Sequence, residues 1–144
     1  MNFIFSNPMR HSVTVTIALD EILDRVYAES AWRAAHAPEV YHLSEDNAAM
    51  ITTRIGQGFD DLVARLQGYV AAANYNPNVD DESIVIVFQQ AVEPADTLEP
   101  ALTQVITSLL ASYVLMCFYG DEGTSYGSAW RKYRAQTTLL LSHT

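Results

Sequence analysis

The sequence is poor in cysteine and in lysine. Its 144 residues include a single cysteine, Cys117, so no internal disulfide can form and a disulfide-stabilised secreted fold is excluded. The single lysine is Lys132. The N-terminal residues show no basic segment followed by an apolar one, so we expect no signal peptide and a reducing, cytoplasmic place of synthesis.

Positive charge is scarce in the whole chain. Eight Lys and Arg residues stand against 17 Asp and Glu residues, which gives a formal net charge of −9. Nucleic-acid binding through a basic face needs clustered Lys and Arg, so this composition argues against it. Charged residues make up only 17% of the chain, whereas a hydrophobic fraction of 49% is sufficient for a packed core. The length predicts one domain over residues 1–144.

The apolar pattern predicts a mainly α fold, a four-helix bundle-like domain with a small two- or three-stranded β-sheet. Apolar residues recur at steps of three and four in four segments, which predicts helices near 17–36, 44–73, 97–119 and 128–141. Ser44 precedes acidic residues and an apolar stripe, as is typical of a helix N-terminus, and Gly120 is a suitable helix stop.

Short runs rich in β-branched and aromatic residues predict strands near 2–5, 12–16 and 83–89. The last is the clearest, because residues 84–88 are five apolar residues in a row and four of them are β-branched. A single strand is not stable alone, so we expect the N-terminal strands to pair with it.

Residues 101–120 form an uncharged run long enough to span a bilayer. The run contains several Ser and Thr residues, and both flanks are acidic, whereas a spanning helix normally has Lys or Arg on its cytoplasmic side. We therefore expect a helix without a membrane role, buried in the core or in a subunit interface.

Candidate chemical sites are weak. His36 and His42 lie six residues apart, not at the spacing that places two ligands on one helical face. The acidic run at residues 80–82 lacks the ligand pattern of a calcium loop. The glycine-rich segment 120–127 has no Gly-Lys-Ser/Thr ending. Cys117 lies in the most apolar stretch, so we expect its thiol to be buried and inert. These patterns predict no metal site, no cofactor and no catalytic residue.

The C-terminal part has the composition of a contact surface. Tyr and Trp are enriched at protein interfaces, and three of the eight basic residues fall within four positions. Such a basic patch on an acidic chain can meet an acidic face of another copy, although the aromatics are equally typical of a core and the bases of a solvated helix face. The candidate interface residues are Tyr126, Trp130, Arg131, Lys132, Tyr133 and Arg134.

The order of these segments resembles that of the small helical head-to-tail connector proteins (neck or adaptor proteins) of tailed phages, particularly those of phages and prophages of gut Bacteroidetes. The resemblance lies in the succession of TVT at 14–16, LDEILDRVYAES at 19–30, a capped helix from Ser44, SIVIVF at 83–88, an apolar helix at 101–119 and WRKYR at 130–134. Such proteins often end in a basic tail, whereas this chain ends in LLLSHT.

The resemblance implies a structural virion protein with no enzymatic activity. It would form a homo-oligomeric ring, commonly of twelve copies, that joins the portal to the tail proteins and lines the DNA channel. An acidic lumen repels DNA and lets it pass without sequence-specific binding, which agrees with the net charge. The alternative is an acidic helical binding or regulatory module of an intracellular complex, which neutralises a basic partner.

Overall fold

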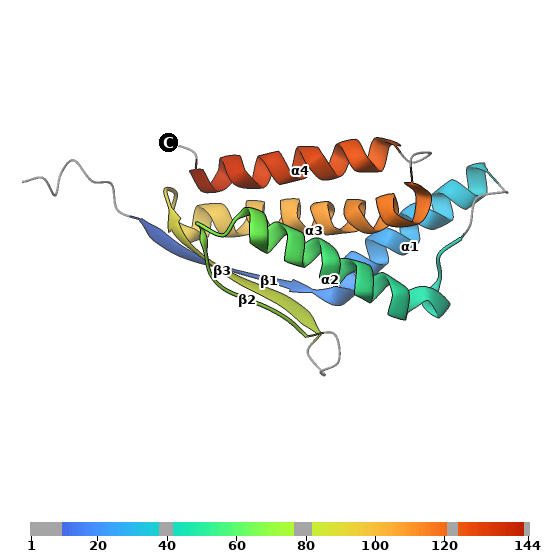
Figure 1. Ribbon diagram of the computed structural model, residues 1–144, viewed down its shortest axis with the longest axis horizontal. Coiled ribbons are helices and arrows are strands. Elements are labelled where there is room, and N and C mark those ends of the chain that lie inside the picture. Colours follow the sequence, from blue (N-terminus) through green and yellow to red (C-terminus); the bar gives the residue numbers. More distant parts are fainter. Residues whose placement is uncertain (1–9, 38–41, 77–81, 121–123, 143–144) are drawn as a thin grey trace, which may run out of the picture.

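The computed structural model describes residues 10–37, 42–76, 82–120 and 124–142, which form four α-helices and a three-stranded antiparallel sheet (Figure 1). This confirms the mainly α class with a small sheet. The elements follow in the order β1 (His11–Ala18), α1 (Leu19–His36), the 3₁₀ turn η2 (Glu45–Asn47), α2 (Ala48–Arg65), β2 (Val70–Asn76), β3 (Ser83–Ala91), α3 (Ala95–Tyr119) and α4 (Thr124–Ser142).

The sheet has the order β1-β3-β2, with both outer strands antiparallel to β3. Ile86 of β3 lies between Val15 of β1 and Ala73 of β2 on one face, and the next residue, Val87, lies beside Thr14 on the other face. The side chains of Val15 and Ile86 are fully buried, whereas Thr14 is exposed. Strict alternation along the strands therefore separates an inner face from an outer one.

α3 is the central helix of the fold. It lies between the sheet and α4 in Figure 1, and α1 and α2 also pack against it. Its apolar run meets the test of length and hydropathy for crossing a bilayer, but much of the helix is buried inside the protein. Fully buried residues on α3 include Leu102, Ile106, Leu110 and Val114. An apolar helix in this place is a core helix, packed on several sides at once.

The sequence-based helix over 44–73 is wrong in its last part. α2 ends at Arg65, and residues 70–76 form β2, which hydrogen-bonds to the free edge of β3. Alanines 71–73 favour a helix by propensity, but β3 is central and its second edge needs a partner for its backbone groups. Gly68 lies in the turn after α2 and was the local signal for the stop.

Other boundaries differ less. β1 extends over His11–Ala18 and α1 follows it directly, where the sequence predicts a strand near 12–16. α4 begins at Thr124, four residues before the predicted start at 128. The predicted strand near 2–5 lies outside the described residues. The partnership of β3 with the strand that follows residue 10 is confirmed.

The predicted helix start at Ser44 and helix stop at Gly120 are confirmed, with Ser44 capping the 3₁₀ turn η2 that leads directly into α2. Ser44 forms a capping box with Asn47: the Asn47 side chain accepts from the Ser44 N–H at 3.0 Å. Gly120 follows α3 with φ of 59°, a backbone conformation that glycine adopts without steric cost.

Candidate interaction surfaces

The described residues form five candidate surfaces: the aromatic region of α4, an arginine cleft, an acidic end, a groove along α3 and the outer face of the sheet. Within the residues that the structure describes, no three His, Cys, Asp or Glu side chains gather as metal ligands. His36 and His42 are both exposed, and the Nδ1 atom of His36 lies 2.8 Å from the carbonyl oxygen of Trp32. The acidic residues Asp80 and Asp81 lie outside the described part of the chain.

Tyr126, a candidate interface residue, is only 8% exposed. Its hydroxyl donates to Glu29 Oε1 at 2.8 Å, and the guanidinium of Arg33 lies against the rings of both Tyr126 and Tyr119. Burial, with the Glu29 hydrogen bond adding to it, raises the pKa of Tyr126 to about 12. The residue therefore ties α4 to α1 within one molecule.

Trp130 and Tyr133 are half-buried and pack against the core. Trp130 meets the ring of Tyr113 on α3 edge-on, with centroids 5.5 Å apart. Trp130 also makes a cation–π contact, in which the guanidinium of Arg134 lies 4.6 Å from the centroid of the Trp130 ring. Such cation–π stacking fixes the plane of the guanidinium and leaves its N–H edges free to bind an anion.

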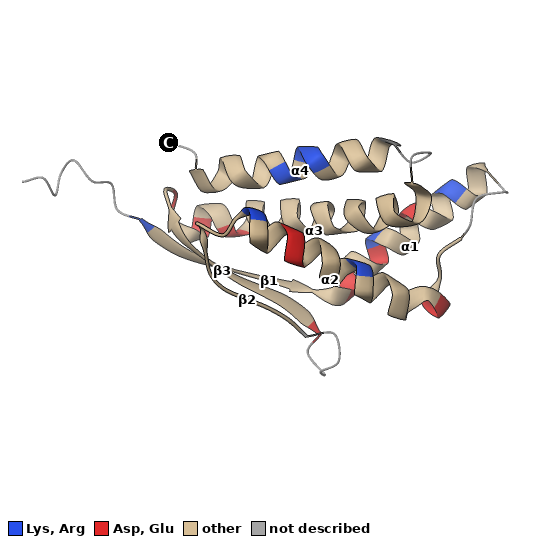
Figure 2. Ribbon diagram, in the orientation of Figure 1, with Lys and Arg blue, Asp and Glu red and all other residues tan. Residues whose placement is uncertain are grey.

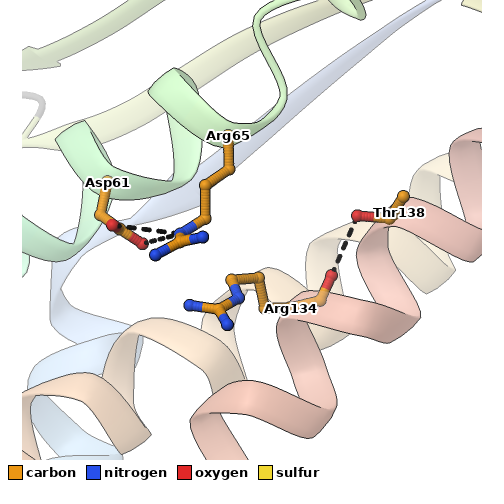
Figure 3. Close-up of polar contacts among 4 residues, drawn as sticks. All are labelled: Asp61, Arg65, Arg134 and Thr138. Atoms are coloured by element: carbon orange, nitrogen blue, oxygen red, sulfur yellow. Dashed lines mark hydrogen bonds and ion pairs between the residues drawn. The ribbon is translucent and has the colours of Figure 1, made fainter.

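The basic residues of α4 do not act alone, because Arg65 at the end of α2 faces them. Arg65, Arg131 and Arg134 line one cleft of about 450 Å³ between α2 and α4, together with Ala135 and Thr138; we call it the arginine cleft. Figure 3 shows the guanidinium groups of Arg65 and Arg134 directed into the same space. Lys132 is exposed, does not line this cleft and lies beside the ring of Tyr133.

One carboxylate partly neutralises the arginine cleft. Asp61 accepts two hydrogen bonds from Arg65 Nε, at 3.0 and 3.2 Å (Figure 3). Among the described residues this is the only ion pair, so Arg131 and Arg134 have no carboxylate partner there. The three arginines and one aspartate leave the cleft with a formal charge of about +2 on a chain of net charge −9.

Exposed carboxylates lie on the first two turns of α1 and on the 3₁₀ turn before α2. Asp20, Asp24 and Tyr27 follow at steps of four and three along α1, which places them on one helical face. The pKa of Tyr27 is raised, first by burial and then by the charges of Glu45, Asp24 and Asp20. All three carboxylates lie on exposed residues. We call this cluster of Asp20, Asp24 and Glu45 the acidic end. None of its members has an ion-pair partner among the described residues.

A longer groove runs along α3 between α1 and α4. Its two parts, of about 840 and 710 Å³, share Ser108 and Tyr133. Ser108 accepts a hydrogen bond from Arg25 Nη1 at 2.6 Å. The exposed side chain of Leu139 lines the larger part, and the exposed side chain of Trp32 lines the smaller one. This groove is mostly apolar, in contrast to the arginine cleft.

Cys117 is exposed, so the prediction of a buried thiol is wrong. The apolar stretch 113–119 occupies the whole circumference of the last turns of α3, but its neighbours cover only part of that circumference. Val114 and Leu115 face the covered side, and Met116 contacts Gly127 of α4. Composition alone indicated burial at every position.

None of the helices that the structure describes covers the outer face of the sheet. In Figure 1 the helices lie on the other side of the sheet. The outer positions are exposed or half-buried, and all of them are uncharged: Thr14, Thr16, Ala18, Ala72, Asn74, Ser83, Val85 and Val87.

No protein-family model matches the chain, and comparison with curated proteins and with solved structures also finds no match. Functional argument therefore rests on the surfaces described above.

Proposed function

We propose that this protein is a structural subunit that assembles with further copies of itself, and that the assembly is a head-to-tail connector ring of a tailed phage. In this role the ring joins the portal to the tail proteins and lines the DNA channel. The order of the sequence segments supports the phage setting, and the surface of the molecule supports assembly.

The observation that carries the proposal is the uncovered, uncharged sheet. Its inner face is the core, yet its outer face carries exposed threonines and alanines and half-buried valines, without a single charge among the outer positions. Neither outer strand contains Lys or Pro, the residues with which soluble proteins commonly protect a sheet edge. A sheet with these properties is suited to contact with another protein subunit.

The charge of the chain supports passage of DNA through such a ring. At a net charge of −9, a subunit presents mainly carboxylates, which repel phosphates over about 8 Å at physiological ionic strength. DNA therefore passes a ring of such subunits without adhering to it.

The test is the state of assembly in solution. Light scattering after gel filtration and native mass spectrometry should show a defined oligomer, and negative-stain images should show closed rings. A stable monomer over a wide range of protein concentration would overturn the proposal. A monomer that binds a basic protein one-to-one, with steep salt dependence, would establish the alternative binding module instead.

A matched pair of variants tests the role of the sheet. Thr16→Lys places a charge on the exposed outer face, so assembly should weaken while the monomer stays folded. Ala35→Lys adds the same charge at an exposed position near the end of α1 and should leave assembly unchanged. Equal oligomer mass for both variants would remove the sheet from the assembly surface.

A further inference from the structure

We propose that the arginine cleft of one copy receives the carboxylates of the acidic end of a second copy. The inference rests on the proposed function and names the contact that would join neighbouring subunits. It concerns the arginine cleft between α2 and α4 and the cluster of Asp20, Asp24 and Glu45.

Contacts within the molecule already hold two arginine side chains of the cleft in place for binding a carboxylate. Asp61 holds Arg65 by its Nε atom, and the Trp130 ring supports the guanidinium of Arg134. Both side chains thus have little freedom left to lose on binding, which favours affinity. Figure 3 shows both guanidinium groups directed into the same space, and guanidinium donors match carboxylates in pairs.

The positive charge of the cleft also favours the binding of an anion. Three guanidinium groups share its walls, and Asp61 neutralises one of them. Like charges at this proximity repel, and a bound carboxylate removes that repulsion. At the acidic end, the three exposed carboxylates that act on Tyr27 likewise repel one another, and a bound cation removes that repulsion.

The arginine cleft and Glu45 of the acidic end lie at opposite ends of α2. Arg65 is the last residue of α2, and Glu45 precedes its first residue by three positions. α2 has 18 residues, so its ends are about 27 Å apart at 1.5 Å per residue. Figure 2 shows acidic colour just beyond the first turn of α2, and basic colour at its last turn and on the middle of α4.

Contact between copies is therefore head-to-tail. A surface that meets a different surface of the next copy generates a ring when the rotation closes, and a filament when it does not. A connector ring needs this heterologous type of contact. The complementary charges, about +2 in the cleft and −3 at the acidic end, supply both orientation and attraction.

The experiment uses charge reversal and its compensation. Arg131→Glu and Arg134→Glu should each raise the apparent dissociation constant of the oligomer by roughly tenfold or more, and so should Asp24→Arg. The double variant Arg134→Glu with Asp24→Arg should recover most of the affinity, because the charges of the contact are exchanged. Arg54→Glu, an exposed arginine on α2 outside the cleft, is the control for net charge and should assemble like the wild type.

Two further readouts keep the test decisive. Arg131 is exposed and takes no part in the stacking on Trp130, so its variant reports on the contact even if Arg134→Glu disturbs the fold. Sodium chloride should weaken assembly, because exposed charges are screened. Inorganic phosphate at equal ionic strength should weaken it further by competing for the cleft in the wild type, and not in the Arg131→Glu variant.

The outcomes separate the two proposals. A wild-type oligomer that is unaffected by both arginine reversals overturns the charge contact and leaves the ring proposal standing. A dimer that is lost on reversal and restored in the double variant supports the contact and overturns the ring. A monomeric wild type overturns both. Loss of binding to a short DNA duplex, without loss of assembly, assigns the cleft to nucleic acid and overturns the inference.

Discussion

The two faces of the sheet share one backbone but differ in the burial and the type of their side chains. On the inner face, Val13, Ile84 and Phe88 are fully buried beneath the helices. On the outer face, Thr14 and Thr16 are exposed and Val85 and Val87 are half-buried, although they alternate with the buried residues on the same strands. The comparison teaches that one face supplies the stability of the fold, while the described helices leave the other face uncovered.

The largest expected effect tests this comparison on two adjacent residues of β3. Ile86→Ala removes a fully buried side chain and should lower the free energy of unfolding by about 2–5 kcal/mol. Val87→Ala, on the outer face, should cost less than about 1 kcal/mol. Urea unfolding at one protein concentration measures both. Equal losses would show that the outer face is covered as well.

A smaller effect is expected where α2 meets α3. A Cβ atom at Gly58 would lie 2.9 Å from Cδ2 of Tyr113 and 3.2 Å from Cδ2 of Leu110. Gly58→Ala should therefore destabilise the protein by about 1–3 kcal/mol, even though alanine favours a helix by about 1 kcal/mol.

Gly68→Ala is the matched control for that change. No atom lies within 4 Å of a Cβ atom built there, so the substitution should be neutral or stabilising by up to about 1 kcal/mol. Thermal unfolding compares the two variants. A stabilised Gly58→Ala protein would contradict the close packing of α2 on α3.

The smallest effect concerns pH and Tyr75, which lies at the edge of the inner face. Its hydroxyl donates to the Thr52 carbonyl oxygen at 2.6 Å. Burial, with Glu82 adding to it, raises the pKa of Tyr75 to about 12 from an ordinary value of 10.0. A raised pKa means that the folded state favours the neutral phenol, so its contribution is complete below pH 10 and is lost as the pH rises toward 12.

Tyr75→Phe should reduce the loss of folding stability that accompanies a rise in pH above 10. The variant also loses one hydrogen bond, which should cost about 1 kcal/mol at neutral pH. Urea unfolding at about pH 8 and about pH 11 measures both parts. Tyr126 contributes in the same direction, since its pKa is also raised to about 12, so the double Phe variant should show the flattest dependence. An unchanged slope in both variants would contradict the burial of these phenols.

Sequence reasoning succeeded where structure depends on near neighbours. The strand at 83–89, the helix start at Ser44 and the stop at Gly120 all follow from local chemistry, and the structure confirms them. It failed for β2, where three alanines and a continuing apolar pattern predict helix. Pairing with β3 decides that segment, and pairing is a property of the whole fold.

The same division applies to the candidate surfaces. The sequence places Arg131, Lys132 and Arg134 together because they are neighbours in the chain. It gave no sign of Arg65, which joins Arg131 and Arg134 only because α2 and α4 flank the same cleft. It also offered Tyr126 as a candidate interface residue, with the core as the alternative, and the structure buries this residue in the core.

The sequence by itself determined the charge imbalance, the fold class and most of the element types, since these depend on composition and on periods of two and 3.6 residues. Only the tertiary structure decided that β2 is a strand, that Cys117 is exposed, and that Arg65, Arg131 and Arg134 line one cleft. These features depend on which elements pack together. That choice minimises the exposed apolar surface and the unpaired backbone groups of the whole chain, and no single segment encodes it.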